Sequence, residues 1–207
     1  MGETTTARKE EIILGACDVF MYEFNGTAIP SDAEIETDAH CVGHTSGGAS
    51  VEYKPTKYDV TNSYGKTVRS FITKEEITVK TGLLSWRLEN VALLSSAKIT
   101  QPEANDEAPI KKLTFGGGDD SKLNTVLVRF RHLKKDTGKY LRFTCVAQGG
   151  NGFTMAFSDT EMSIDAELGA IEYIKDFFAE FKEELTAEEV AQLVADGAIT
   201  AASSSSV

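Results

Sequence analysis

Cysteine is scarce in this chain, and long apolar runs are missing from it. The three cysteines among 207 residues, Cys17, Cys41 and Cys145, form an odd and widely spaced set. Such a set does not build a disulfide framework, and free thiols fit a reducing compartment. No apolar run approaches the roughly 18 residues of a transmembrane helix. The opening MGETTTARKEE has no apolar core, so no secretory signal is expected there.

A basic surface is also missing. The formal net charge is −11, whereas a protein that grips nucleic acid needs clustered Lys and Arg on its phosphates. The charge is uneven: residues 159–207 carry 12 acidic and 2 basic residues, while residues 1–158 carry 20 acidic and 19 basic ones. A nearly neutral body is therefore followed by an acidic C-terminal quarter. If this chain meets nucleic acid, it does so without holding it.

Patterns for catalysis or metal binding are sparse. His40, Cys41 and His44 are zinc-type ligands, but no second cluster follows at the spacing of a zinc finger, so a polar loop is preferred. The glycine runs at 116–118 and 149–152 lack the Lys-Ser/Thr ending of a phosphate-binding loop and are interpreted as turns. No catalytic residue, metal site or cofactor is predicted.

The chain does contain a succession of short β-type runs. Residues 17–30 are predicted to form a hairpin that turns at Asn25-Gly26, and residues 31–50 are predicted to be a loop. Pro55 cannot donate to a strand ladder, so its strand is expected at a sheet edge or beside a bulge. Further strands are predicted at residues 51–60, 66–73, 76–86, 111–115, 125–133, 139–147, 153–157 and 161–167.

Helical spacing occurs twice. Apolar residues within 88–95 recur at three- and four-residue steps, which predicts a short helix. The same steps from Ile171 to Leu185 predict an amphipathic helix. A second short helix is expected to follow it, with Thr186 and Glu189 as its capping box and Gly197 as its stop.

One long stretch, from Gly43 to Leu94, carries a family resemblance. It reads GHTSGGASVEYKPTKYDVTNSYGKTVRSFITKEEITVKTGLLSWRLENVALL. It resembles the tail tube (major tail) proteins of long-tailed bacteriophages and prophages. The segments TVLVRFRHLKKDTGKYLRFTCVAQ and SDTEMSIDAEL continue the resemblance, which covers roughly residues 12–168.

The resemblance implies a mainly β protein, a sandwich or barrel with a short flanking helix. It implies a non-enzymatic subunit without cofactors that forms hexameric rings, stacked into a tube through which DNA passes. Its implied partners are further copies of itself, the tape-measure, tail-tip and tail-terminator proteins, and in contractile tails a sheath; a membrane is not among them. The implied locations are the virion tail and, during assembly, the host cytoplasm.

The expected organisation has four parts. A flexible N-terminal arm covers residues 1–12 and a tail-tube β domain covers 13–168. A helical acidic extension follows at 169–197, and a disordered tail ends the chain at 198–207. The extension departs from the family pattern, which usually finishes soon after a strand like SIDAEL.

The resemblance also suggests site residues. Contacts between subunits or rings are expected around one hairpin, at Pro55, Lys57, Tyr58, Asn62, Tyr64 and Gly65. Acidic residues proposed to face the lumen are Asp18, Glu23, Glu75 and Glu76. Basic residues expected to face outward or to pair across interfaces are Arg129, Arg131, Lys134, Lys135 and Arg142.

Two other classes stay open at this stage. A virion-associated β-sandwich module could recognise carbohydrate or a host surface, with Trp86 as a stacking platform or the loop from Gln148 to Gly152 as its site. An enzyme whose site leaves no trace in the sequence is the third class.

Overall fold

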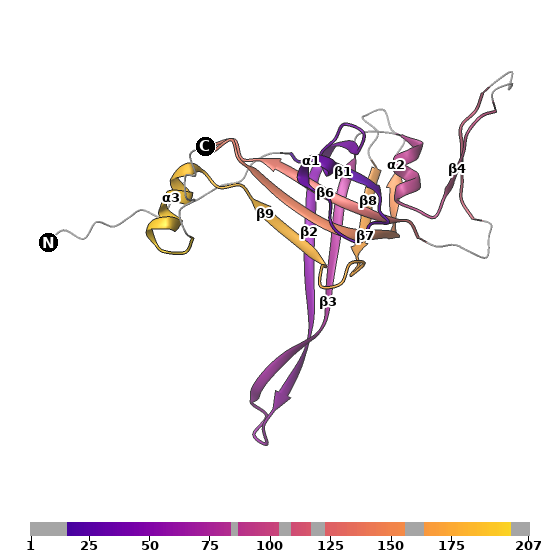
Figure 1. The fold of residues 1–207 in the computed structure, drawn as a ribbon. Coiled ribbons are helices and arrows are strands. Elements are labelled where there is room, and N and C mark those ends of the chain that lie inside the picture. The colour runs from indigo at the N-terminus through magenta and orange to yellow at the C-terminus, as the bar shows by residue number, and fades with distance from the viewer. Residues whose placement is uncertain (1–15, 84–86, 104–108, 117–122, 156–163, 200–207) are drawn as a thin grey trace.

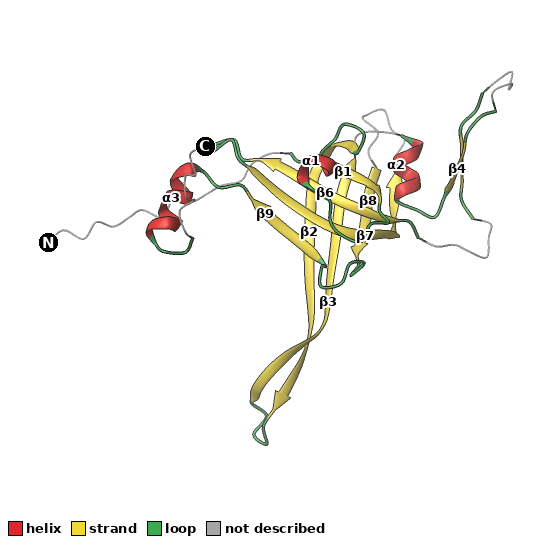
Figure 2. Ribbon diagram, in the orientation of Figure 1, coloured by secondary structure: helices red, strands yellow, loops and turns green. Residues whose placement is uncertain are grey.

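A computed structural model describes residues 16–83, 87–103, 109–116, 123–155 and 164–199 (Figure 1). Within these residues the protein is mainly β, as predicted, and its helices are short (Figure 2). The strands are β1 (Asp18–Glu23), β2 (Cys41–Thr61), β3 (Thr67–Leu83), β4 (Lys98–Thr100), β5 (Lys112–Thr114), β6 (Thr125–Leu133), β7 (Tyr140–Met155), β8 (Ile164–Ala170) and β9 (Ala179–Glu183). The helices are α1 (Asp32–Ile35), α2 (Leu88–Leu93) and α3 (Ala187–Ala195).

Six strands close into an antiparallel barrel. The order of pairing is β6-β1-β2-β3-β8-β7, and β7 pairs back onto β6. Strand β9 lies on the same edge of β7 as β8, because β8 pairs from Ala147 onward and β9 pairs with Leu141–Cys145. Strands β4 and β5 form a separate two-stranded sheet.

The barrel interior is filled by one apolar cluster. Each strand of the circuit contributes to it through alternate residues, since successive strand side chains point to opposite faces. Val91 of α2 and Leu94, directly after the helix, complete it. Its buried members are Val19, Met21, Val42, Val79, Val91, Leu94, Val126, Val128, Phe130, Phe143, Cys145, Ala147, Ile164, Ala166 and Leu168.

Helix α2 lies where residues 88–95 predicted one, and it is held against the barrel by close contact. A Cβ built on Gly149 would lie 2.3 Å from the carbonyl oxygen of Leu94, so only glycine fits there. The Nδ2 of Asn124 donates to the carbonyls of Ala92 (2.8 Å) and Ser95 (3.1 Å) at the C-terminal end of the helix. The predicted turn at 149–152 is wrong: β7 runs through it, with a register shift between Gly149 and Phe153.

A second apolar cluster covers part of the outside of the barrel. It joins Phe20, Phe24, Ile35, Leu127 and Val146. The segment around α1 and the segment 171–177 pack over this face. Strand β1 is therefore buried on both sides, with Val19 and Met21 inside and Phe20 outside.

The predicted hairpin at 17–30 is wrong, and so is the loop at 31–50. Both edges of β1 are already used, by β6 along its whole length and by the start of β2. After Glu23 the backbone N–H of Phe24 donates to Thr125 (2.8 Å) and the chain leaves the sheet. The expected loop contains α1 and the first ten residues of β2.

Two other strand predictions are confirmed with changes. The predicted runs 66–73 and 76–86 are one continuous strand, β3, as far as Leu83. Pro55 lies next to a bulge, since the β2–β3 register shifts between Thr56 and Lys57. The hairpin of β6 and β7 is confirmed, with Gly138 at a φ of 67° in its turn.

The helix predicted over Ile171–Leu185 is wrong. The backbone turns within this segment, where Asp176 has a φ of 63°, and residues 179–183 form β9 on the edge of β7. The apolar steps have another cause: Ile171, Ile174 and Phe177 pack on the outer cluster from the turn. The sheet therefore gains a further strand that ends at Glu183, within the segment expected to be a helical extension.

The second C-terminal helix is confirmed as α3. The Thr186 hydroxyl accepts from the backbone N–H of Glu189 (3.2 Å), and the Glu189 carboxylate accepts from the backbone N–H of Thr186 (2.6 Å). Gly197 has a φ of 72° just beyond the helix end. The arm at 1–12 and residues 200–207 of the expected tail lie outside the described residues.

Candidate assembly surface

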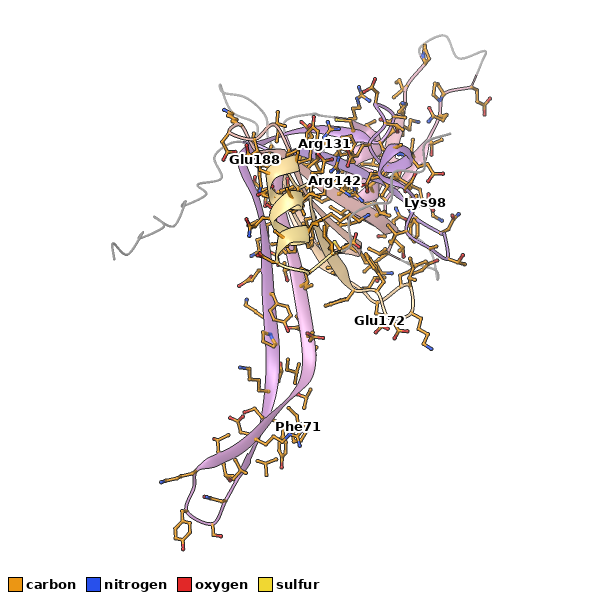
Figure 3. All side chains as sticks on the ribbon, turned by 60° about the vertical axis from the view of Figure 1, so that its left-hand side comes forward. Phe71, Lys98, Arg131, Arg142, Glu172 and Glu188 are labelled. Carbon is orange, nitrogen blue, oxygen red and sulfur yellow. The ribbon has the colours of Figure 1, made fainter. Side chains whose placement is uncertain are left out.

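The most distinctive feature is a two-stranded ribbon that projects from the barrel (Figures 1 and 3). Strand β8 pairs with β3 only as far as Thr78, and β1 pairs with β2 only at its first residues. Beyond these points β2 and β3 pair only with each other among the described residues. We call residues 53–77 the ribbon. At about 3.3 Å per residue, the run from Tyr53 to Thr61 extends roughly 30 Å.

The ribbon carries large apolar side chains in solvent. A two-stranded hairpin is marginally stable by itself in water, and contiguous exposed apolar surface marks interaction sites. The exposed set is Tyr53 (49%), Tyr58 (62%), Val60 (39%), Tyr64 (88%), Val68 (67%), Phe71 (46%) and Ile72 (55%). This surface is therefore the candidate site.

Cross-strand pairing sorts the distal ribbon into two faces. Tyr58 lies opposite Phe71, and Val60 lies opposite Arg69, so these four share one face. The Arg69 guanidinium carbon lies 4.9 Å from the centre of the Phe71 ring, a cation–π contact. We call these four residues the aromatic face; among its members the only charge is positive.

The ribbon tip is well organised. The Asn62 side-chain oxygen accepts from the backbone N–H groups of Tyr64 and Lys66, both at 3.0 Å. Gly65 has a φ of 72° and its N–H donates to the Asn62 carbonyl (2.9 Å). These bonds fix the turn that presents the Tyr64 ring to solvent.

The predicted contact residues all lie on the ribbon: Pro55, Lys57, Tyr58, Asn62, Tyr64 and Gly65. The sequence prediction missed Val60, Val68, Phe71 and Ile72. A usable signal existed, because β-type residues continue on both sides of the predicted turn.

The barrel also leaves two strand edges open. The four strands β2, β3, β8 and β7 form a continuous sheet. On β2 the edge from Ala49 onward lacks a partner among the described residues, because β1 reaches only His44. On β7 the residues Phe153–Met155 pair with β8 alone, because β6 ends opposite Gln148. Such edges are templates for pairing with another chain.

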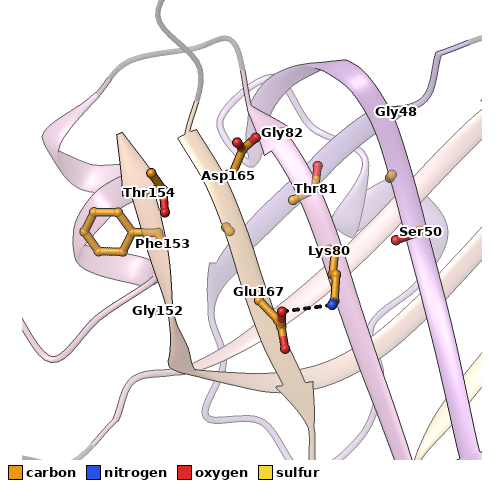
Figure 4. A pocket seen from close by; sticks show the side chains of 12 residues that line it. Gly48, Ser50, Lys80, Thr81, Gly82, Gly152, Phe153, Thr154, Asp165 and Glu167 are labelled. Atoms are coloured by element: carbon orange, nitrogen blue, oxygen red, sulfur yellow. Dashed lines mark ion pairs between the residues drawn. The ribbon is translucent and has the colours of Figure 1, made fainter. Parts of the chain in front are cut away.

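A shallow hollow of about 590 Å³ spans these four strands (Figure 4). Glycines at 48, 82 and 152 line it, and Lys80 is paired with Glu167 at 3.1 Å across it. Lys54 and Glu52 form a further ion pair (2.8 Å) on β2. Both lysines here are paired with an acid, and Asp165 also lines the hollow.

A cluster of ion pairs lies on the outer face of the barrel beside the second apolar cluster. Glu36, just after α1, accepts from Arg142 Nε (2.6 Å), Arg129 Nη1 (2.9 Å) and Arg131 Nη1 (3.1 Å). The Arg129 side chain is fully buried and that of Glu36 is 8% exposed. The other members of this charge cluster are Asp18, Asp32, Lys182 and Glu184.

The pKa values of the acids in the charge cluster show that attraction by the arginines outweighs the cost of burial. Burial alone would raise the pKa of Glu36, but hydrogen bonds from Arg142 and Arg131 outweigh it and the pKa lies below its usual value. The pKa of Glu184 is lowered by its hydrogen bond from Arg142. Arg129, Arg131 and Arg142 therefore pair with acids of their own subunit on the outer face of the barrel.

The four acids proposed for a lumen are not brought together. Asp18 pairs with Arg131 (2.8 Å) in the charge cluster, and Glu23 is exposed at the end of β1. On the ribbon, Glu75 accepts from the Tyr53 hydroxyl (2.6 Å) and Glu76 pairs with Lys74. Asp18 and Glu23 lie on one strand of the barrel, whereas Glu75 and Glu76 lie where the ribbon begins.

The residues considered for metal binding or catalysis have structural surroundings. The His40 ring stacks on Tyr22, with 4.0 Å between ring centres. Cys41 packs against the second apolar cluster. Cys145, which was not among these candidates, is buried in the barrel, and burial raises the pKa of its thiol to about 12. Across the described ranges, no group of three His, Cys, Asp or Glu side chains could hold a metal ion. No described helix has the length and apolar character to cross a membrane.

The comparisons with known proteins add no family. No protein-family model matches the chain, and no curated protein matches it. Of the two sites considered for a carbohydrate-binding module, Trp86 lies outside the described residues. The other, Gln148–Gly152, is part of β7 and not a free loop.

Proposed function

We propose that this protein is the repeating subunit of a phage or prophage-derived tail tube, which assembles as stacked six-membered rings around a channel for DNA. The observation that carries the proposal is the ribbon, whose exposed aromatic and aliphatic side chains need a partner. The sequence resemblance over residues 12–168 supplies the kind of assembly.

The open strand edges support lateral association. In the proposed ring, the free edge of β2 in one subunit pairs with the free edge of β7 in the next. Because both edges belong to the same four-stranded sheet, this pairing would extend that sheet around the ring. Main-chain hydrogen bonds would provide much of the affinity, as in other cases of strand addition.

The ribbon would then supply contacts to an adjacent subunit or ring. Aromatic side chains are enriched among the residues that dominate binding energy at interfaces. Tyr58, Tyr64 and Phe71 are therefore the first candidates for such anchors. The hydrogen-bonded tip lowers the entropy lost when Tyr64 is fixed in an interface.

Ion pairing on the four-stranded sheet suits a wall along which DNA slides. Lys80 pairs with Glu167, and Lys54 with Glu52, so little unpaired positive charge would attract phosphate. The three arginines of the charge cluster would also attract phosphate, but acids of the same chain neutralise them.

Electron microscopy and sedimentation of concentrated protein test this function directly. We expect rings or tubes whose amount rises with protein concentration. A protein that stays monomeric at all concentrations and binds glycans would contradict the proposal and favour the decoration module. A tube whose inner wall carried Arg129, Arg131 and Arg142 would contradict the proposed charge arrangement.

A further inference from the structure

Helix α3 is an amphipathic element that buries none of its residues. Val190, Leu193 and Val194 recur at helical spacing and share one face. Val190 is 39% exposed and Leu185, just before the helix, is 38% exposed, whereas Leu193 and Val194 are half-buried. A short helix seldom persists without burying its apolar face. The single capping box of Thr186 and Glu189 stabilises only the first turn of α3, so the incompletely covered stripe indicates a docking partner.

Charge restricts what that partner can be. Residues 184–199 contain four acidic residues and no basic one. A partner should therefore combine exposed apolar side chains with positive charge. Among the described surfaces the distal ribbon has this combination: residues 57–72 carry three basic residues and one acidic one, between exposed Tyr58, Phe71 and Ile72.

The two elements of one chain do not meet. Figure 1 shows α3 to one side of the barrel. Figure 3, in which Glu188 and Phe71 are labelled, shows the helix at the level of the barrel, while the half of the ribbon that bears Phe71 extends away from it. Each copy therefore offers one helix and one ribbon to other copies. An interface between two different patches of identical chains is head-to-tail, and it propagates into rings or filaments.

We infer that α3 of one copy docks on the aromatic face of the ribbon of a neighbouring copy. The stripe of Val190, Leu193 and Val194 packs on Tyr58 and Phe71. Asp196, which flanks this stripe on the helix, pairs with Arg69. The inference rests on the proposed self-assembly and names the partner of the ribbon.

Two single substitutions separate the halves of this contact. Phe71→Asp disrupts the apolar contact surface of the ribbon and leaves α3 intact. Leu193→Asp disrupts the apolar stripe of α3 and leaves the ribbon intact. We expect each variant to keep the melting temperature of the wild-type chain and to lose extended assemblies in sedimentation velocity. In an equimolar mixture the intact α3 of Phe71→Asp can dock on the intact ribbon of Leu193→Asp, so extended assemblies should return in part.

The outcomes distinguish this inference from the proposed function. If the wild-type chain assembles and Leu193→Asp assembles at the same concentration, the docking is overturned while the tube function stands. If Phe71→Asp alone prevents assembly, the ribbon contacts another surface, and the docking is again overturned. A wild-type chain that never assembles overturns the proposed function itself.

A charge exchange tests the register of the contact. Arg69→Glu should raise the concentration needed for assembly about tenfold, and adding Asp196→Lys should restore it. Lysine at a helix C-terminus suits the helix dipole, so Asp196→Lys should not unfold α3. Lys98→Glu, at an exposed position on β4, is the matched control that Asp196→Lys should not rescue. Absence of rescue for Arg69→Glu would contradict the assigned pairing.

Direct contact can be trapped by oxidation. Chains with Tyr58→Cys and chains with Val190→Cys are mixed under assembly conditions and oxidised. We expect a reducible dimer in the mixture and much less of it from either variant alone, which also controls for the native cysteines at 17, 41 and 145. Equal dimer from a single variant would show that the new thiols do not meet as proposed.

Discussion

The barrel and the ribbon are built from the same kind of β-strand, but the barrel buries its apolar side chains and the ribbon exposes them. In the barrel, strands pair on both edges and apolar side chains such as Val128 and Leu168 are fully buried. In the ribbon, two strands pair only with each other and Phe71 and Ile72 remain about half exposed. The barrel accounts for the stability of the chain. The exposed apolar side chains of the ribbon would contribute favourable free energy only when a binding partner buries them. Substitutions in the two regions should therefore affect different measurements.

Removing the central acid of the charge cluster should have the largest effect on the barrel. Glu36→Gln leaves three guanidinium groups around a neutral amide, and loss of one partner from a buried ion-pair cluster costs about 3–5 kcal/mol. Urea denaturation should show a lower midpoint at unchanged slope. Asp38→Asn, at an exposed position two residues away, is the control and should change the free energy of unfolding by less than about 0.5 kcal/mol. Equal losses in both variants would rule out a special role for the cluster.

A methyl group at Gly149 should have the next largest effect. Its Cβ would overlap the Leu94 carbonyl at 2.3 Å, so either β7 or the end of α2 must move. Overpacking of this kind costs about 1–3 kcal/mol. Thermal unfolding of Gly149→Ala should show the loss, while Gly48→Ala gives a comparison at a site with nothing within 4 Å but a φ of 89°. A loss confined to Gly48→Ala would show that backbone strain, and not contact with α2, dominates at these glycines.

Acid should weaken the barrel by a smaller and graded amount. The folded-state pKa values of Glu36, Asp32 and Glu184 lie below their ordinary values. Their contribution to stability is therefore complete above the unfolded pKa, 4.5 for a glutamate, and is lost as the pH falls through the folded value. Denaturation measured from about pH 6 down to about pH 3 should show this acid limb. It should be shallower in Glu36→Gln, and an unchanged limb would assign it to other carboxylates.

Replacing the tip of the ribbon should have the smallest effect on barrel stability, although it changes the most residues. Replacing residues 57–65 with a short Gly-Ser turn removes the tip and the β2 half of the aromatic face but no member of either apolar cluster. We expect cooperative unfolding within about 0.5 kcal/mol of the parent chain and complete loss of tube formation in electron microscopy. Tubes that form at the normal concentration would show that the ribbon carries no assembly contact.

Local signals in the sequence predicted the elements that local interactions build. The β6–β7 hairpin follows from glycine at the positive φ of residue 138, and α3 follows from the reciprocal bonds of Thr186 and Glu189. The helix at 88–95 was visible from its spacing alone. The sequence signals for these features lie between residues fewer than ten positions apart, and the features were predicted correctly.

Long-range partners account for the errors. Strand β9 exists because β7 offers it an open edge almost 40 residues earlier in the chain, and nothing within residues 171–185 records that edge. The spacing of Ile171, Ile174 and Phe177 fits a helix equally well. Glu36 and Arg129 are 93 residues apart, so single-sequence periodicity could not place them in one cluster. The candidate site was predicted in part, because Tyr58 and Tyr64 lie near a turn with a local signature while Phe71 gains its role only from its cross-strand neighbour.

The way α3 joins the barrel determines how the chain would respond to mechanical load. Five residue pairs connect β9 to β7, and Glu184 is anchored beyond them by Arg142 (2.5 Å). Antiparallel ladder bonds lie perpendicular to the strands. A pull on α3 along β9 would therefore shear all five pairs at once, whereas a sideways pull would open them one at a time. If α3 holds a neighbouring copy, the direction of tension in the assembly decides whether this joint acts as a firm tether or as the first point of rupture.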